Sequence, residues 1–238
     1  MAQDKFERLY DHDLQTHMQG HIVAHDRLDL VVKEAARRCV LNGKRVLDIG
    51  ISDGYTIGRL CQLRATVYGI DISEVAIRVC VEKLRDRNLG AVLEQGDLRK
   101  IPFDDGYFDI IFACEILEHM EGENLNSALA EVRRCLRVNG FFLATTPYKE
   151  DLNASMVCCP FCSRVFHSAG HFQTFDERKA SNLLTSNGFN VLSVKKIYGT
   201  DMTIRLTKFS FLMPLVRLVI RLCQIDRLTH LMAIATKA

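Results

Sequence analysis

The sequence predicts an α/β protein with a doubly wound, mostly parallel sheet, and three observations support this prediction. Short apolar runs alternate along the chain with amphipathic helical segments. The connections between them are short, as in repeated βαβ units. The first connection is a turn that contains Gly50 and Gly54 and opens a helix. We therefore expect a single domain over residues 1–238, with a seven-stranded, mostly parallel sheet and two insertions.

Seven apolar runs of strand length predict the sheet. Each run is short and bounded by turn residues or charged residues, as expected for strands buried on both faces. In chain order, the predicted strands are residues 45–49, 66–70, 91–94, 108–113, 141–146, 189–197 and 231–236.

Helical periodicity and end signals predict the helices. Ser73 is placed to cap the second helix of the alternation, and Asn139-Gly140 is expected to close the helix before the fifth strand. Thr174 and Glu177 have capping-box spacing, and Gly188 falls at the C′ position of the helix that they begin. The predicted helices cover residues 22–39, 56–63, 73–88, 125–136 and 174–187.

Composition and charge exclude several classes of protein. The chain has 238 residues, 48% hydrophobic and 25% charged, so it can bury a full core and is not a fibrous or disordered chain. Its formal net charge of +2 makes nucleic acid an unexpected partner. No run of 18 apolar residues could span a bilayer, and the polar segment 1–13 is neither a secretory signal nor a transit peptide. Most of the nine cysteines stand singly in apolar segments, which favours a cytoplasmic location.

Two segments interrupt the alternation and are the predicted insertions. Residues 148–173 lie where a short loop would normally join a strand to a helix, and residues 199–229 separate the last two strands. Within the second segment, residues 208–228 have a basic amphipathic pattern. One interpretation is a peripheral membrane contact that admits a lipid-like substrate, and the other is packing on the sheet or on the second subunit of a homodimer.

Five motifs occur in an order that resembles a known family. They are the turn Val46–Tyr55, Asp71 at a strand end, Gly96-Asp97-Leu98, the strand 108–114 and the segment 136–142. Over residues 43–146 the chain resembles the class I S-adenosylmethionine (SAM) dependent methyltransferases, and it is most similar to their small-molecule branch, which includes quinone-biosynthesis enzymes. The resemblance implies a Rossmann-like fold. A dinucleotide oxidoreductase would instead carry G-x-G-x-x-G, and this turn lacks the middle glycine.

The resemblance also implies SAM as the cofactor and assigns the residues that bind it. Asp71 would hold the ribose, Asp97 would accept from the adenine amine, and Ser52 stands where the family often has glycine. Each carboxylate has an alternative as a turn or cap residue. The implied cofactor-binding residues are Asp48, Gly50, Gly54, Asp71, Ile72, Asp97, Leu98 and Cys114.

A cluster of metal-ligating residues lies in the first insertion. Cys159, Cys162, His167 and His171 have the spacing C-x2-C-x4-H-x3-H, which resembles a zinc knuckle with His in place of the last Cys. Two thiolates and two imidazoles complete a tetrahedral set, so the zinc would be structural. The alternatives are a redox pair of the two cysteines, an active-site role for His171 alone, and replacement of one thiol by Cys158.

These observations predict a SAM-dependent methyltransferase that acts on a small-molecule acceptor at a hydroxyl, with a lipid-like acceptor as one option. A poorly acidic hydroxyl needs a general base, and His119, at the carboxyl edge after the fourth strand, is the candidate. Its alternative is a capping or packing role. Two alternatives for the whole chain are methylation of RNA or protein, with recognition by the zinc-knuckle-like insertion, and a non-catalytic SAM-fold partner subunit.

Overall fold

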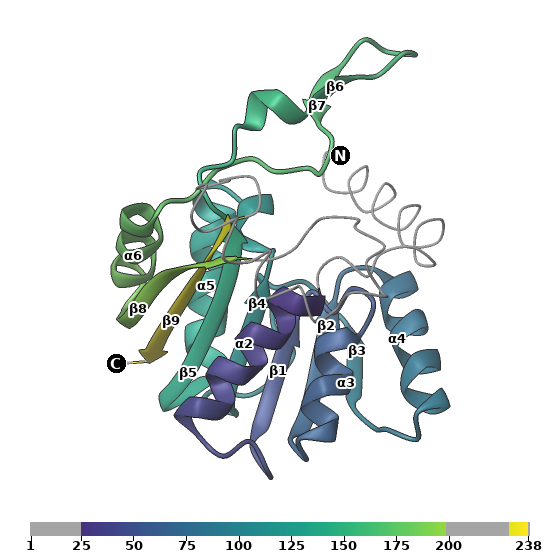
Figure 1. The fold of residues 1–238 in the computed structure, drawn as a ribbon, viewed down its shortest axis with the longest axis vertical. Helices are drawn as coiled ribbons and strands as arrows, with labels where there is room; N and C mark the ends of the chain where they lie inside the picture. Colours follow the sequence, from purple (N-terminus) through teal and green to yellow (C-terminus); the bar gives the residue numbers. More distant parts are fainter. Residues whose placement is uncertain (1–24, 199–228, 238) are drawn as a thin grey trace.

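The computed structural model describes residues 25–198 and 229–237 (Figure 1). The strands of its main sheet are β1 (Arg45–Ile49), β2 (Thr66–Asp71), β3 (Val92–Gln95), β4 (Phe108–Cys114), β5 (Leu136–Pro147), β8 (Phe189–Tyr198) and β9 (Thr229–Lys237). The helices are α2 (His25–Arg38), α3 (Tyr55–Gln62), α4 (Glu74–Asp86), α5 (Gly122–Cys135) and α6 (Glu177–Ser186). Two 3-10 helices lie in the connections: η1 (Leu117–His119) follows β4, and η2 (Leu152–Ser155) follows β5.

The strand order confirms the predicted seven-stranded sheet. The order is β3-β2-β1-β4-β5-β9-β8, with β1 to β5 parallel and β9 antiparallel to both of its neighbours. The chain runs outward from β1 to β3 and then returns to place β4 on the other side of β1. The carboxyl ends of β1 and β4 therefore adjoin at the switch point, where open α/β sheets bind their ligands.

Adjacent apolar residues within the central strands supply the two faces of the sheet. Helices α2, α3 and α4 bury residues such as Val31 and Ile57 in the same core cluster as Ile110. Helices α5 and α6 pack on the opposite face, where Leu129 shares a cluster with Ile111. Because successive strand residues point to opposite faces, Ile110 and Ile111 serve the two layers seen in Figure 1.

Two predicted capping signals are wrong. Helix α5 ends at Cys135, and Asn139-Gly140 lies inside β5, where the register with β4 shifts and Asn139 takes a φ of 59°. The cap of α6 is Asp176, whose side chain accepts from the Lys179 N–H at 2.7 Å, instead of Thr174. Asp176 directly precedes the first helical residue, whereas Thr174 stands two residues too early to reach the same N–H groups.

Residues 148–173, which we call the arm, project from the carboxyl edge of the sheet (Figure 1). In the arm, β6 (Met156–Cys158) and β7 (Val165–His167) form an antiparallel hairpin. The amphipathic pattern of residues 208–228, and the part of the 22–39 helix before His25, lie outside the described residues. Of the helices in the described ranges, none is both long and apolar enough to cross a membrane.

Candidate active site

The turn between β1 and α3 has the backbone that its two glycines predict. Gly50 and Gly54 have φ values of 72° and 75°, which only glycine adopts readily. A Cβ at Gly54 would lie 2.5 Å from Cys80 Sγ, and a Cβ at Gly50 would overlap the side chain of Ile116. Both positions therefore require glycine, because of the positive φ and because there is no room for a Cβ. Ile116, from the segment after β4, packs over the turn at Gly50.

Asp71 ends β2, and its carboxylate holds this turn in place. One oxygen accepts from the Ser52 N–H at 3.2 Å and the other from the Ser73 N–H at 2.9 Å. Ser52 has a φ of 48°, a left-handed conformation that costs a non-glycine residue about 1 kcal/mol. Ser73 also caps α4, as predicted, by accepting from the Ala76 N–H at 3.1 Å. A carboxylate offers about four lone-pair sites, so Asp71 has capacity for ribose hydroxyls as well.

Asp48 and Cys114 lie at the ends of β1 and β4 beside the turn. Asp48 is only 2% exposed, and burial raises its pKa well above the ordinary value, with Asp71 and Asp53 nearby adding to the effect. Burial likewise raises the pKa of the Cys114 thiol. A thiol that stays protonated is a poor nucleophile, so any contribution of Cys114 comes from its backbone.

Asp53, within the turn, connects α2 to α4. Its carboxylate lies 3.2 Å from His25 Nε2 and 3.0 Å from Lys83 Nζ. Burial raises the pKa of Asp53, but hydrogen bonds from His25, Lys83 and the Tyr55 N–H outweigh burial and lower the pKa to about 2. Asp53 and Asp71 are therefore both held in place by hydrogen bonds from neighbouring parts of the fold.

The residues assigned to adenine lie beyond β2 and β3. Leu98 is 8% exposed and Ile72 is half-buried, so both can offer apolar surface. Asp97 is paired with Arg99, whose Nε lies 3.0 Å from both carboxylate oxygens, and this hydrogen bonding lowers the pKa of Asp97. Arg99 thus binds the carboxylate that the resemblance assigns to the adenine amine, a contact that sequence reasoning missed.

His119 lies in η1, directly after β4, and contacts the arm. Its Nδ1 is 3.2 Å from the carbonyl oxygen of Gly170. A carbonyl only accepts, so the ring proton lies on Nδ1 and Nε2 carries the lone pair. Burial and the neighbouring His171 together lower the pKa of His119 to about 4. The imidazole is therefore neutral at neutral pH.

The four predicted zinc ligands are split between the two ends of the arm. The rings of His167 and His171 stack with centroids 4.7 Å apart. Cys159 and Cys162 lie in the turn between β6 and β7, where the Cys159 carbonyl accepts from the Ser163 N–H at 2.9 Å. Within the described residues, the groups of three or more metal-ligating side chains contain no cysteine. The zinc set stays a prediction, and the described geometry does not assemble it.

Sequence reasoning missed most of the charged side chains around His119. Glu115 lies 3.7 Å from Arg27 Nε and 3.4 Å from His230 Nε2, contacts that join β4 to α2 and β9. Burial raises the pKa of Glu115, but Arg27 and His230 outweigh burial and lower it. The spacing of Glu115, Glu118 and His119 directly after a strand was the available signal.

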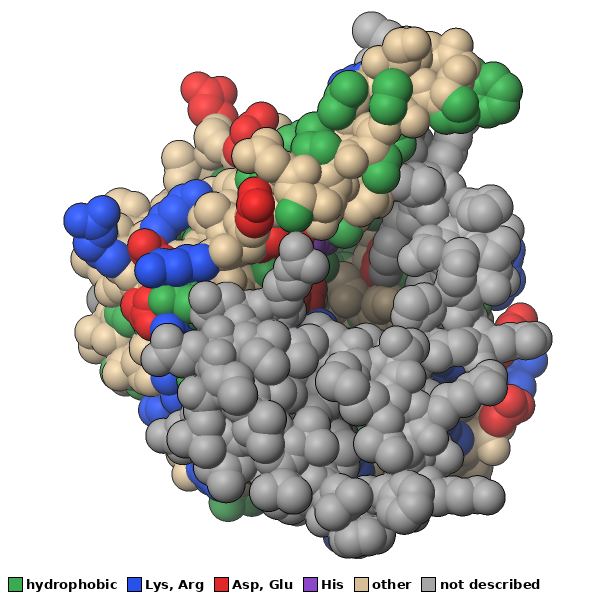
Figure 2. Space-filling model, turned by 45° about the horizontal axis from the view of Figure 1, so that its top comes forward, with side chains coloured by type: hydrophobic (Ala, Val, Ile, Leu, Met, Phe, Trp, Pro, Cys, Tyr) green, Lys and Arg blue, Asp and Glu red, His purple; other side chains and the backbone are tan. Residues whose placement is uncertain are grey.

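Histidine and acidic side chains are visible where the arm meets the sheet, and hydrophobic ones gather toward its tip (Figure 2).

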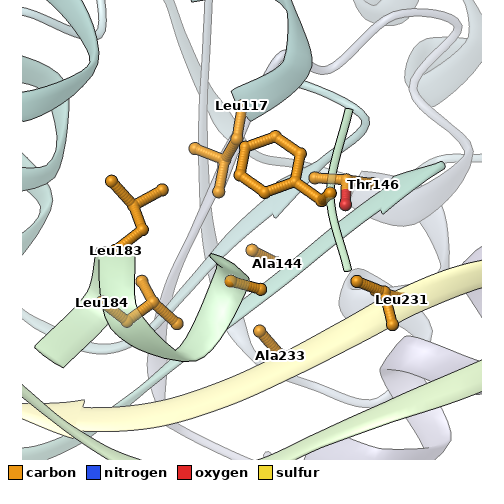
Figure 3. A pocket seen from close by; sticks show the side chains of 9 residues that line it. Leu117, Ala144, Thr146, Leu183, Leu184, Leu231 and Ala233 are labelled. Atoms are coloured by element: carbon orange, nitrogen blue, oxygen red, sulfur yellow. The ribbon is translucent and has the colours of Figure 1, made fainter. Parts of the chain in front are cut away.

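A small apolar cavity adjoins η1. Leu117 lines it together with side chains of β5, β9 and α6, including Leu183, Leu184 and Leu231 (Figure 3). Its volume of about 10 Å³ is room for roughly one water molecule. This cavity is a gap in the packing and is too small to hold a substrate.

The strand order and the turn after β1 define the fold, which is the Rossmann-like fold of the class I methyltransferases. Residues 47–144 match the family model described as "Methyltransferase domain". This range runs from β1 into β5 and contains Gly50, Asp71, Asp97 and His119. The arm lies outside it.

Curated relatives match less than half of the chain. The phthiotriol/phenolphthiotriol dimycocerosates methyltransferase of Mycobacterium tuberculosis is 33% identical over 104 residues, which are 43% of this chain and 37% of that protein. The ubiquinone biosynthesis O-methyltransferase of Coxiella burnetii is 33% identical over 89 residues, which are 37% of this chain and 38% of that protein. The chain thus spans less than two-fifths of the length of these relatives.

A solved structure extends the likeness in fold to nearly the whole chain. It belongs to the complex between the Haloferax volcanii Trm112 methyltransferase activator and a methyltransferase. The TM-score is 0.68 at 20% identity, with 95% of this chain and 96% of that chain covered. At this level of identity, the likeness concerns the fold alone.

Proposed function

We propose that the chain is a SAM-dependent methyltransferase that transfers a methyl group to a hydroxyl oxygen of a small-molecule acceptor. The observation that carries the proposal is the positive-φ turn at Gly50 and Gly54, held by the Asp71 carboxylate, inside the matched range 47–144. The matched O-methyltransferase of ubiquinone biosynthesis supports oxygen as the acceptor atom and a quinone-like small molecule as the first class to test.

The residues at the turn fit the cofactor that this activity needs. SAM supplies an electrophilic methyl group on a sulfonium sulfur, so the protein contributes alignment and exclusion of water. Asp71 would accept from the ribose hydroxyls, and Asp97 from the adenine amine. The backbone at Gly50 and Cys114 would border the methionine part, with Asp48 orienting its amino group. Ile72 and Leu98 would cover the adenine.

His119 belongs to the acceptor side of the site. The lone pair on its Nε2 makes it able to accept a proton from a hydroxyl. A ring with a pKa of about 4 is a weak base for that purpose, because proton transfer is most effective when the pKa lies near the working pH. His119 therefore needs help from its neighbours to activate an alcohol or phenol.

Native mass spectrometry and calorimetry with S-adenosylhomocysteine test the proposal. We expect one nucleoside per chain, and a weaker affinity in Asp71→Asn, with the circular dichroism of the folded chain unchanged. A chain that binds no nucleoside at millimolar concentration would overturn the proposal and favour the non-catalytic partner subunit. A screen of hydroxylated aromatic acceptors with labelled SAM then identifies the substrate.

The peripheral membrane contact and the homodimer both concern residues 208–228, outside the described ranges, and they stay predictions. Co-sedimentation with anionic vesicles tests the first. Native mass of the intact chain tests the second. Binding to vesicles would extend the screen to lipid-like acceptors.

A further inference from the structure

The arm and η1 hold three metal-ligating side chains at one point. Each of Glu118, His119 and His171 offers a ligand atom, and these atoms all lie within 4.8 Å of one another. The rings of His119 and His171 lie at 75° with centroids 4.8 Å apart. Two adjacent residues of η1 thus meet a residue more than fifty positions later in the chain.

Hydrogen bonds fix the arm against η1. The Phe172 N–H donates to the Glu118 carbonyl at 2.9 Å, and the Gln173 side-chain amide donates to the Leu117 carbonyl at 3.2 Å. The His119 ring N–H donates to the Gly170 carbonyl, so three hydrogen bonds join residues 117–119 to residues 170–173. The segments that carry the three ligands are therefore joined by hydrogen bonds to backbone carbonyls, and a metal site requires such preorganisation.

Glu118 is a buried side chain to which the described part of the fold gives no hydrogen-bond partner. It is 1% exposed, and neither of its carboxylate oxygens has a hydrogen-bond partner among the described residues. A buried carboxylate without a partner is strongly unfavourable unless a cation neutralises it.

Both histidines are held in the tautomer that a metal ligand needs. The His119 N–H at Nδ1 donates to the Gly170 carbonyl, and His171 Nδ1 lies 2.5 Å from a carboxylate oxygen of Glu150. In each ring, the lone pair is therefore on Nε2. Metal-ligating histidines characteristically bind a carbonyl or carboxylate through the other ring nitrogen, and Glu150 and Gly170 supply those partners.

A second group, formed by Glu150, His167 and His171, supports this site and does not compete with it. His167 Nδ1 accepts from the N–H groups of Ala169 and His171, at 3.3 Å and 3.2 Å. The proton of the neutral ring is then on Nε2, 3.5 Å from Glu150, so neither nitrogen has a lone pair to give to a metal.

We propose that Glu118, His119 and His171 bind a divalent transition-metal cation that holds the acceptor oxygen. Two imidazoles and one carboxylate suit zinc, manganese or iron(II), and three protein ligands leave coordination positions open. The inference rests on the proposed function. Ile116, which covers Gly50, is two residues from Glu118, so the cation would lie beside the cofactor turn.

In this arrangement His119 is a metal ligand, and the bound cation activates the acceptor hydroxyl. A hydroxyl bound to a divalent cation has a lowered pKa and releases its proton to water near neutral pH. The acceptor oxygen then forms a bond to the methyl carbon as the carbon–sulfur bond of SAM breaks. The products are the methyl ether, S-adenosylhomocysteine and the released proton, so neither electrons nor a further reactant are needed. The substrate class is a small molecule with a metal-binding hydroxyl, such as a catechol or hydroxyquinone.

Cobalt(II) titration of the metal-free full chain tests the proposal. After dialysis against a chelator, we expect one Co²⁺ per chain with visible ligand-field bands and no thiolate charge-transfer band. Glu118→Gln and His171→Ala should weaken binding at least tenfold, and Glu150→Gln by about tenfold through its effect on His171. Cys162→Ser, in the hairpin turn, is the control and should bind as the wild type does. Circular dichroism verifies that each variant is folded.

Three results would overturn the proposal. They are a wild type that binds no cobalt or zinc at micromolar concentration, metal affinity unchanged in both Glu118→Gln and His171→Ala, and a thiolate band that Cys162→Ser abolishes. The last result would move the metal to the zinc-knuckle set. S-adenosylhomocysteine affinity, measured on the same samples, separates this test from that of the proposed function. Loss of the metal site leaves nucleoside binding intact, and absence of nucleoside binding leaves the metal result standing.

Discussion

The cofactor turn (residues 48–54 with Asp71) and the cluster of Glu118, His119 and His171 occupy the same edge of the sheet, yet they treat buried charge differently. At the turn, Asp71 accepts from two backbone N–H groups, and Asp53 is paired with Lys83. In the cluster, the Glu118 carboxylate has no hydrogen-bond partner among the described residues. At the turn, Asp71 and Asp53 thus have partners within the fold, whereas a bound cation would give the Glu118 carboxylate the partner that the described residues do not provide.

Gly54→Ala should have the largest effect, because it breaks the turn without touching the cluster. The substitution combines a φ of 75° with a Cβ 2.5 Å from Cys80 Sγ, so we expect a loss of roughly 3 kcal/mol in unfolding free energy. Gly43→Ala is the matched control. It has a φ of 72° but nothing within 4 Å of the new Cβ, and it should cost only about 1 kcal/mol. Urea unfolding of both variants measures the difference, and equal losses would show that space at Gly54 does not matter.

Asp71→Ala should come next, with an effect on both stability and affinity. Two N–H groups lose their charged acceptor, so we expect a loss of roughly 2 kcal/mol in stability and a 10- to 100-fold weaker affinity for S-adenosylhomocysteine. Metal binding at the cluster should be unchanged. Calorimetry with nucleoside and with Co²⁺ on one preparation compares the two regions directly. Parallel losses of both ligands would mean that the regions fold as one unit.

The turn could be predicted from the sequence because its determinants are local. A buried strand, two glycines and a helix follow one another within ten residues, and parallel pairing of Ile49 with Ile70 then brings Asp71 beside them. Short apolar runs between helical segments likewise predicted the seven strands. Predictions that rested on one or two residues were less accurate. Asn139-Gly140 lies where the register of β5 with β4 shifts instead of ending a helix, and Asp176 caps α6 instead of Thr174.

The cluster could not be predicted, because it depends on where a long segment returns to the sheet. His119 meets Gly170 across 51 positions, and apolar periodicity gives no information on that path through the arm. The sequence did show His171 in a metal-binding pattern, with His167 and two cysteines as its partners. In the described structure, His167 does lie beside His171, but its other near neighbours are Glu118, His119 and Glu150 instead of the cysteines.

Acidification should weaken the turn through Asp53. Its pKa is about 2 in the fold against about 4 in an unfolded chain, so its pairing with Lys83 and His25 stabilises the protein above pH 4 and is lost as the pH falls toward 2. With partial solvent screening, we expect this group to contribute on the order of 1–2 kcal/mol. Asp53→Asn should remove that part of the acid dependence, which chemical unfolding at a series of pH values measures. An unchanged slope between pH 4 and pH 2 would contradict the assignment.

Glu118→Gln gives the smallest expected change and the sharpest contrast between paired and unpaired carboxylates. In metal-free protein, the substitution replaces a buried acid that has no partner by a neutral amide of the same shape, so stability should rise by about 1 kcal/mol. Glu115→Gln is the matched comparison three residues earlier. Its carboxylate is paired with Arg27 and lies 3.4 Å from His230 Nε2, so stability should fall, because the buried Arg27 guanidinium loses its counter-charge.

Adding zinc should make the wild type more stable than Glu118→Gln, which is the opposite of the order expected without metal. The cation stabilises any folded chain that binds it, so the wild type should gain stability in proportion to its affinity, whereas Glu118→Gln should gain much less. Thermal unfolding of wild type, Glu118→Gln and Glu115→Gln, with and without zinc, separates these effects. A metal-free Glu118→Gln protein that is less stable than the wild type would mean that the carboxylate already has a favourable partner. In that case the contrast between the two regions would disappear, and the turn and the cluster would both be complete as folded.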